Sequence, residues 1–355
     1  MPAAADDRRP SGVLRRALHW WRGRSRRTRL GLLLGVAAAA VLIPLATTQL
    51  AFDEAGASAV PDQTAPDQAT RMALARRFAP VLRLDRRELL VPISVESYLS
   101  ASDLIERRGA TRVVAKTSPT VDDLDRDDDC LTDQPACTFN LDVRGANPPF
   151  VRPQAYARIQ NRLLAAGAPR VVYAHVTRYD DGGDYAIQYW FLYDFNYRLN
   201  LHESDWEQIT IHLDSDRQPI EAFYSSHESG QKRVWARMEK EADHPVDYVA
   251  QGSHANYFKP GNPAVTLRCT PVRRQLKVCV KNRTVHDIAN GKRVLRPGRD
   301  YRIREFPGTP FVGGWGSGNY VAGKKTRDVV SDPRLRPAWA DPLSRFDRAK
   351  LIAKL

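Results

Sequence analysis

One segment near the N-terminus constrains this chain more than any other feature. The 23 residues Leu30–Phe52 carry no charged side chain, and about 20 apolar residues suffice for a helix to cross a bilayer. Nine arginines and two aspartates give residues 1–29 a charge of +7, whereas Asp53 and Glu54 follow the uncharged segment. Positive charge before a span predicts a cytoplasmic N-terminus. We therefore expect one transmembrane helix over residues 30–52, in the plasma membrane, with the main domain extracytoplasmic.

A cleaved export signal is the competing interpretation of the same segment. The small residues Ala57–Ala59 resemble a cleavage site, although the apolar core of such signals is usually only about 7 to 15 residues long. A retained anchor fits the length better, and both interpretations export the rest of the chain. The formal charge of +13 falls to +6 once residues 1–29 are set aside. No basic stretch with interleaved aromatic residues surrounds the polar segment Tyr193–Asp214, so nucleic-acid binding is not expected.

The four cysteines also indicate export. They form two closely spaced pairs, Cys130 with Cys137 and Cys269 with Cys279. We expect two local disulfides, since extracytoplasmic thiols oxidise. A zinc site is disfavoured because no CxxC motif is present. Four cysteines allow three connectivities, and the local one is the simplest.

The domain organisation follows from composition along the chain. Residues 53–70 are small, polar and punctuated by proline, as in a tether. The acidic loop Asp122–Cys137 has alternating aspartates but lacks the glycine and final glutamate of an EF-hand, so a solvated loop is the default and calcium the alternative. The predicted organisation is a basic cytoplasmic tail at 1–29, an anchor at 30–52, a linker at 53–70, an extracytoplasmic domain at 71–345 and a basic tail at 346–355.

The expected fold is mainly β, an antiparallel β-sandwich with peripheral helices. Residues 153–169 have a helical pattern that ends at glycine and proline. From residue 170 onward, β-branched and aromatic runs are separated by short turn clusters. Four successive strands between residues 170 and 226 with short connections imply antiparallel pairing, and further strand patterns up to residue 306 supply enough β-structure for a sandwich.

A cluster of polar residues lies where two of these predicted strands meet. Asp194 ends one run, and His202, Asp205 and Glu207 precede the alternating hydrophobic residues of the next. Three carboxylates and one imidazole suit a hard divalent cation such as Ca²⁺ or Mg²⁺, with Mn²⁺ a further candidate. The alternative is a hydrogen-bonded loop whose acids cap backbone N–H groups or pair with Arg198.

A second group of residues is expected to line a ligand groove beside that cluster. His227 and Glu228 end the next strand, and Ser253, His254 and Asn256 lie in a glycine-flanked turn. A catalytic Ser–His–acid triad is disfavoured, because Ser253 has no nucleophile-elbow motif and its neighbouring histidine is adjacent in sequence. A turn fixed by side-chain to backbone hydrogen bonds is the simpler interpretation of His254 and Asn256.

Several motifs resemble a known family. "HESDWE", "YSSHESG" and "VAQGSHANYF" occur in the order typical of the family named after the yeast vacuolar protein sorting factor number sixty-two. The likeness is good from Val171 to Phe258, thinner to Pro342 and absent before Arg71. A more distant similarity is to the necrosis- and ethylene-inducing peptide-like cytolysins, which are β-sandwiches.

The cytolysin resemblance implies a metal site. In that family a divalent cation is held by an aspartate, a histidine eight residues on, an aspartate three further and a glutamate two further. Asp194, His202, Asp205 and Glu207 reproduce this spacing. This chain departs from the cytolysins in having "HES" before the DWE and in carrying an anchor, so a diffusing toxin is not expected.

The function expected from the sequence is binding at the cell envelope. The domain would hold one divalent cation and bind a glycan or a lipid headgroup, in a bacterium with a GC-rich genome. The runner-up is a metal-dependent hydrolase of envelope material with Glu207 or His227 as general base. A structural or trafficking interaction domain is the third interpretation.

Overall fold

The computed structural model describes the chain from Pro66 onward, with interruptions. The described residues are 66–125, 137–146, 153–179, 183–198, 200–227, 229–267, 283–317, 319–321, 324–325, 330–344, 346 and 350–351. The expected anchor at 30–52 lies outside them and stays a prediction. Within the described ranges, no helix is both long and apolar enough to span a membrane.

A nine-stranded mixed sheet forms the body of the domain. Its central path runs β16-β5-β6-β7-β8-β9-β19, and β17 and β18 extend it beside β7. The strands β5 to β9 pair antiparallel, as expected, whereas β16 joins β5 and β19 joins β9 in parallel. The strand bounds are β5 Val171–Arg178, β6 Tyr185–Asn196, β7 Asn200–Leu213, β8 Pro219–Ser226, β9 Ser229–Val234, β16 Arg302–Arg304, β17 Asn319–Val321, β18 Lys324–Lys325 and β19 Lys350–Leu351.

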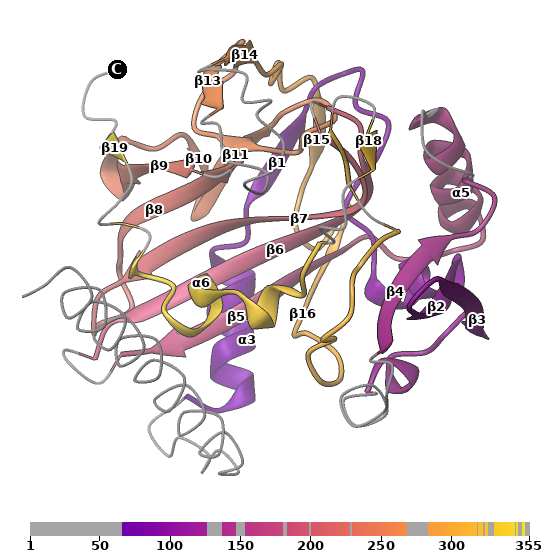
Figure 1. The fold of residues 1–355 in the computed structure, drawn as a ribbon. Helices are drawn as coiled ribbons and strands as arrows, with labels where there is room; N and C mark the ends of the chain where they lie inside the picture. The colour runs from indigo at the N-terminus through magenta and orange to yellow at the C-terminus, as the bar shows by residue number, and fades with distance from the viewer. Residues whose placement is uncertain are drawn as a thin grey trace, which may run out of the picture. The chain divides into compact units, whose positions relative to one another are not determined.

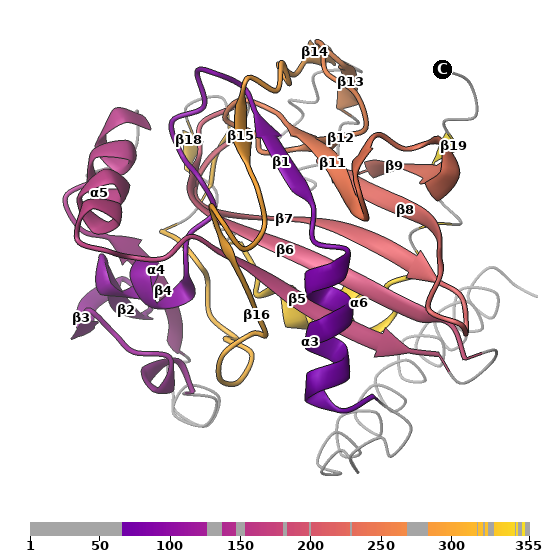
Figure 2. The ribbon, with the colours of Figure 1, turned by 180° about the vertical axis from the view of Figure 1, so that it is seen from behind.

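A smaller sheet packs on one face of this body. It runs β10-β11-β1-β15 with β12 beside β11, and it lies across β7 and β8 in both ribbon views (Figure 1, Figure 2). Leu82 and Val249 of this sheet share one buried core with Ile209 and Tyr224 of the large sheet. The fold is therefore mainly β, with two sheets enclosing a common core. The bounds are β1 Val81–Leu84, β10 Lys240–Glu241, β11 His244–Val249, β12 Asn256–Tyr257 and β15 Arg293–Leu295.

Short helices and a third sheet complete the described structure. Helix α3 packs along β5 on the side of the smaller sheet, and α5 lies beside the end of β6 with the third sheet, β3-β2-β4 (Figure 2). The helices are α3 Gln68–Arg77, α4 Val95–Ser100, α5 Pro153–Ala165, α6 Pro337–Ala340, η1 Asp122–Leu124, η2 Trp235–Arg237 and η3 Pro333–Leu335. The remaining strands are β2 Ser102–Arg108, β3 Thr111–Thr117, β4 Cys137–Val143, β13 Ala264–Leu267 and β14 Arg283–His286.

The chain near its C-terminus covers the second face of the large sheet. Ala338 O accepts a hydrogen bond from the Gln188 amide at 2.7 Å, and the Trp339 ring stacks on His175 with centroids 3.7 Å apart. As a result β6 is buried on both faces along its whole length. Gln208 and Thr210 of β7, which alternate with Ile209 and Ile211, are buried as well.

The cysteine predictions fall mostly outside the described residues. Cys137 is disulfide-bonded, but Cys130, Cys269 and Cys279 lie in undescribed parts of the chain. The predicted pairings therefore stay predictions. The acidic loop is described only as far as Asp125, and there Asp123 accepts hydrogen bonds from Thr120 at 2.8 and 2.9 Å.

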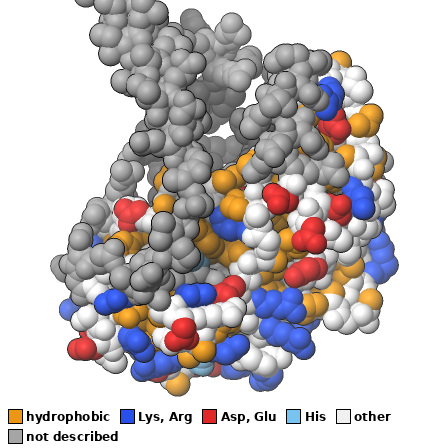
Figure 3. Space-filling view, turned by 90° about the horizontal axis from the view of Figure 1, so that it is seen from below, with side chains coloured by type: hydrophobic (Ala, Val, Ile, Leu, Met, Phe, Trp, Pro, Cys, Tyr) orange, Lys and Arg blue, Asp and Glu red, His pale blue; other side chains and the backbone are white. Residues whose placement is uncertain are grey.

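The surface charge is mixed where it can be seen. On the face shown in Figure 3, basic and acidic side chains of the described residues alternate with apolar ones. Among the exposed large hydrophobic residues are Val113 and Val114 of β3.

Candidate functional site

The candidate site lies at the end of the long β6–β7 hairpin, where the pairing becomes irregular. Tyr193 pairs with Asp205, but Phe195 lies opposite both Glu203 and Ser204. Ser204 has a φ of 53°, an uncommon conformation for a residue other than glycine. Irregularities of this kind bend a strand and redirect its side chains. The sequence cluster therefore sits on a distorted strand end.

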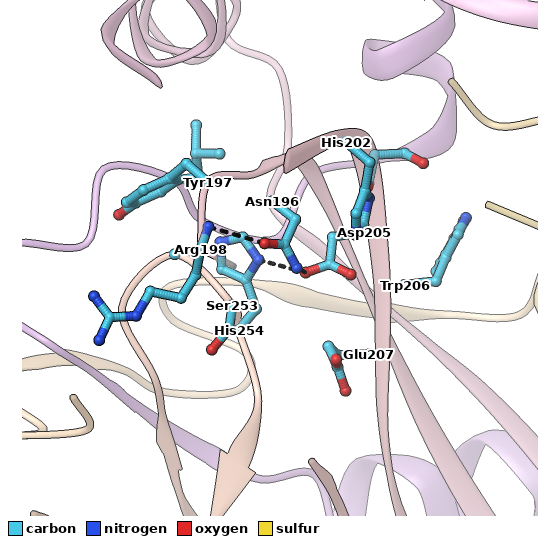
Figure 4. Close-up of polar contacts among 12 residues, drawn as sticks. Asn196, Tyr197, Arg198, His202, Asp205, Trp206, Glu207, Ser253 and His254 are labelled. Carbon is cyan, nitrogen blue, oxygen red and sulfur yellow. Dashed lines mark hydrogen bonds and ion pairs between the residues drawn. The ribbon is translucent and has the colours of Figure 1, made fainter. Parts of the chain in front are cut away.

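A buried ion pair is the centre of the site. His254 Nδ1 lies 2.8 Å from Asp205 Oδ2, and its Nε2 lies 3.5 Å from Glu88 Oε1. Burial disfavours a charged imidazole, yet Glu88 and Asp205 together raise the pKa of His254 to about 9. The same charge lowers the pKa of Glu88 despite its burial. His254 is therefore an imidazolium at neutral pH, held between two carboxylates, as Figure 4 shows for Asp205.

Rigid partners fix this imidazolium. Its ring stacks on Tyr193 with centroids 3.8 Å apart and an interplanar angle of 6°. His254 has a φ of 53° and lies two residues after Gly252, whose N–H donates to Glu88 Oε2 at 2.6 Å. A Cβ on Gly252 would come within 2.7 Å of the Tyr197 ring, so the turn needs glycine there. The glycine-flanked turn expected from the sequence thus serves to place His254.

Glu207 lies beside this ion pair with a different environment. It is partly exposed and accepts a hydrogen bond from Ser225 Oγ, and Ser225 is in turn bonded to the Asn256 amide at 3.2 Å. Burial and the charge of Asp205 raise the pKa of Glu207 well above its ordinary value. Asp205 also accepts from the Asn196 amide at 3.1 Å. Two neighbouring carboxylates therefore repel each other at the start of the buried strand.

The other two expected cation ligands have partners of their own. Asp194 Oδ2 accepts from the Gln160 amide of α5 at 2.6 Å, and burial raises its pKa to about 7. His202 Nδ1 lies 2.6 Å from Ser204 O, and burial lowers its pKa. Throughout the described ranges, no three His, Cys, Asp or Glu side chains are arranged to hold a metal ion. Arg198 does not pair with these acids; its guanidinium donates to His286 O.

A second polar cluster adjoins the first at the end of β8. Asp287 is fully buried and accepts from Ser253 Oγ at 3.1 Å and from Tyr257 Oη at 2.7 Å. His227 Nε2 lies 2.8 Å from Asp287 Oδ2. Burial would raise the pKa of Asp287, but these partners, His227 foremost, lower it. Glu228, the other expected groove residue here, lies outside the described residues.

In this second cluster the hydroxyl of Ser253 donates a hydrogen bond to Asp287. Ser253 and His227 both bind Asp287, so the carboxylate stands between hydroxyl and imidazole. In a Ser–His–acid triad the imidazole stands in the middle, where it can take the proton of the serine. Ser253 is therefore not activated as a nucleophile.

Three residues that complete the site gave no signal in the sequence. Glu88 follows β1, Gln160 lies on α5 and Asp287 follows β14, each far along the chain from the residue that it binds. Glu88 and Asp287 are ordinary acids in stretches without a motif. A buried histidine that stays protonated requires counter-charges, but the local sequence around His254 does not identify the acids that supply them.

No protein-family model and no curated protein matches this chain. Similar solved structures include "NLPPya in complex with glucosamine", with 17% identity, a TM-score of 0.31 and coverage of 57% of this chain and 73% of that chain. Another is "Toxin fold for microbial attack and plant defense", with 18% identity, a TM-score of 0.31 and coverage of 57% and 74%. The resemblance to the vacuolar protein sorting factor family stays a prediction.

Proposed function

We propose that this domain binds a divalent cation at the start of β7 and, through it, a hydroxyl-rich ligand such as a glycan or a lipid headgroup. Asp205 and Glu207 would supply the main oxygen ligands, with His202 and Asp194 as the further candidates that the spacing indicates. Ca²⁺ and Mg²⁺ prefer such oxygen donors, and Mn²⁺ accepts them together with imidazole. In this proposal residues 30–52 tether the domain to the outer face of the plasma membrane.

The repulsion between Asp205 and Glu207 is the observation that carries the proposal. Burial and the Asp205 charge raise the Glu207 pKa well above its ordinary value, so the free site favours a proton on Glu207. A bound divalent cation would supply the missing positive charge. His254 already balances Asp205 and Glu88, whereas Glu207 accepts its hydrogen bond from the neutral hydroxyl of Ser225.

The donor set suits a hard cation by its chemistry, but its arrangement does not enclose one. Asp194 would have to leave Gln160, and His202 would have to bind through Nε2, since Nδ1 lies against Ser204 O. The proposal therefore expects these two side chains to be the weaker contributors. A bound cation would also keep open coordination positions, and hydroxyl groups of the ligand would fill them.

Cation binding by the full-length protein in mild detergent tests this proposal. We expect about one equivalent of Ca²⁺, Mg²⁺ or Mn²⁺ in titration calorimetry and elemental analysis. Asp205→Asn and Glu207→Gln should abolish it. Asp184→Asn is the matched control, because Asp184 also pairs with a histidine, His212, but at the far end of the hairpin. Equal cation uptake by all four proteins, or uptake by none, would overturn the cation site.

Ligand binding is the second half of the test. NLPPya has been solved with glucosamine and with mannosamine, so these two amino sugars are suitable first probes, beside vesicles of anionic and neutral phospholipids. We expect binding of one class to require the cation and to vanish in Asp205→Asn. Binding that persists in chelator would separate the ligand site from the cation site.

A further inference from the structure

A histidine outside the proposed cation site has the features of a general base. His227 follows β8 directly, and its φ is 55°. Its side chain is 12% exposed, whereas the Asp287 carboxylate that it contacts is fully buried. Residues other than glycine held at positive φ are strained, and such strain is often found at functional positions. In this conformation the Nε2 edge of the imidazole lies against Asp287.

The two ring nitrogens of His227 differ in their surroundings. Nε2 lies 2.8 Å from Asp287 Oδ2. The other partners of Asp287 lower its pKa as His227 does, so the carboxylate is ionised and accepts the Nε2–H proton. Within the described part of the chain, Nδ1 has no hydrogen-bond partner. A neutral His227 therefore carries its lone pair on Nδ1, and this is the ring nitrogen that can accept a proton.

A second histidine in the same sheet shows that an Asp–His contact alone is not enough. His212 Nε2 lies 2.9 Å from Asp184, but its Nδ1 lies 3.7 Å from Glu221. Both nitrogens of His212 therefore face carboxylates, and neither is free to take a proton from a bound molecule. This contrast sets His227 apart and supplies a matched control.

We propose that His227 is a general base, positioned by Asp287, in the hydrolysis of a carboxylic ester. His227 Nδ1 takes a proton from water as the water oxygen bonds to the ester carbonyl carbon. The imidazolium then returns that proton to the alkoxide oxygen as the carbon–oxygen bond breaks, which leaves an alcohol and a carboxylic acid. An ester suits a lone imidazole because the same group serves as base and then as acid. This step does not involve the cation.

The first test is ester hydrolysis by the full-length protein, with 4-nitrophenyl acetate and peracetylated glucosamine as probes. His227→Asn and His227→Gly are suitable variants, because asparagine and glycine both tolerate positive φ. A positioned general base contributes roughly 10²-fold or more, so we expect kcat to fall by that order with KM little changed. His212→Asn should hydrolyse both probes like the unmodified protein.

Two further readouts separate catalysis from a structural role. Added imidazole should restore activity to His227→Gly, which a purely structural histidine would not permit. Asp287→Asn should lower kcat without raising KM, and Asp287→Glu should recover part of the loss. Hydrolysis by the unmodified protein no faster than by His227→Asn, or no rescue by imidazole, overturns the proposal. Cation uptake should be unchanged in His227→Asn, so this proposal and the cation site can fail separately.

Discussion

The two ends of the β6–β7 hairpin carry the same kind of ion pair in different surroundings. Asp205 and His254 lie 2.8 Å apart with side-chain exposures of 9% and 0%, whereas Asp184 and His212 lie 2.9 Å apart with exposures of 35% and 17%. The contact distances are nearly equal, so burial is the main difference. Water cannot replace a lost partner at the buried end, and it readily does so at the exposed end.

The largest expected effect follows removal of the buried imidazolium. His254→Asn keeps a residue that tolerates the φ of 53° but leaves Asp205 and Glu88 without their shared cation. Breaking a buried pair in this way typically costs about 3 to 5 kcal/mol. Denaturant unfolding at pH 7 in chelator measures the loss. A loss under about 1 kcal/mol, the usual worth of an exposed pair, would mean that water reaches the site and that the two ends do not differ as described.

The pH dependence of stability should also reflect the buried end. Burial raises the pKa of Asp194 to about 7 and, with Asp142, that of Glu203 to about 7, while Glu88 and Asp205 raise the pKa of His254 to about 9. Each group binds its proton more tightly when folded. The contributions of the two carboxyl groups to the free energy of unfolding are complete below about pH 4 and are lost as the pH rises through 7. The contribution of His254 is complete below about pH 6.5 and is lost as the pH rises through 9.

The expected result is a net fall in the free energy of unfolding from pH 5 to pH 10, which the lowered pKa of His202 opposes only near pH 6. A pKa that is higher by one in the folded state than in the unfolded state corresponds to about 1.4 kcal/mol, so the total fall should reach several kcal/mol. Denaturant unfolding in chelator at a series of pH values measures it. His254→Asn should flatten the part of the curve above pH 7, and a curve that rises between pH 5 and pH 9 would contradict the assigned directions.

A smaller effect is expected from the turn that places His254. Gly252→Ala puts a methyl group within 2.7 Å of the Tyr197 ring at a φ of 76°. Overpacking of this kind costs about 1 to 3 kcal/mol. Gly298→Ala is the control, since its φ of 74° is nearly the same but nothing lies within 4 Å of its added Cβ. Similar losses in both variants would assign the cost to backbone strain instead of the crowded turn.

Local pattern was sufficient to predict the four central strands β5 to β8 of the large sheet and α5. Alternation between Ile209 and Leu213 indicates a strand, and the helical pattern of residues 153–169 matches α5 at Pro153–Ala165. Antiparallel order followed from the short connections between β5 and β8. These features depend on residues that are close together in the sequence, so the periodicity of the sequence reveals them directly.

Contacts between distant segments were not predictable in the same way. β1 pairs in parallel with β11, and β2 to β4 form a sheet where no strand was expected. Glu88 meets Gly252 across 164 positions of the chain. No local periodicity encodes such a partner, because the choice depends on which segments the completed core brings together. The sequence therefore drew attention to the acids of β7, but it did not predict that His254 would lie between Asp205 and Glu88.

The smallest expected effect is at the exposed end of the hairpin, and it makes the comparison decisive. His212→Asn removes the same chemical group as His254→Asn, but Asp184 remains 35% exposed and Glu221 remains partly exposed. Water and salt can then solvate both carboxylates, so the loss should stay below about 1 kcal/mol. Parallel denaturation of the two variants at low and high salt tests this, since only the exposed pair should weaken as salt rises. Equal losses would mean that removing an imidazole costs the same at both ends, whatever its burial.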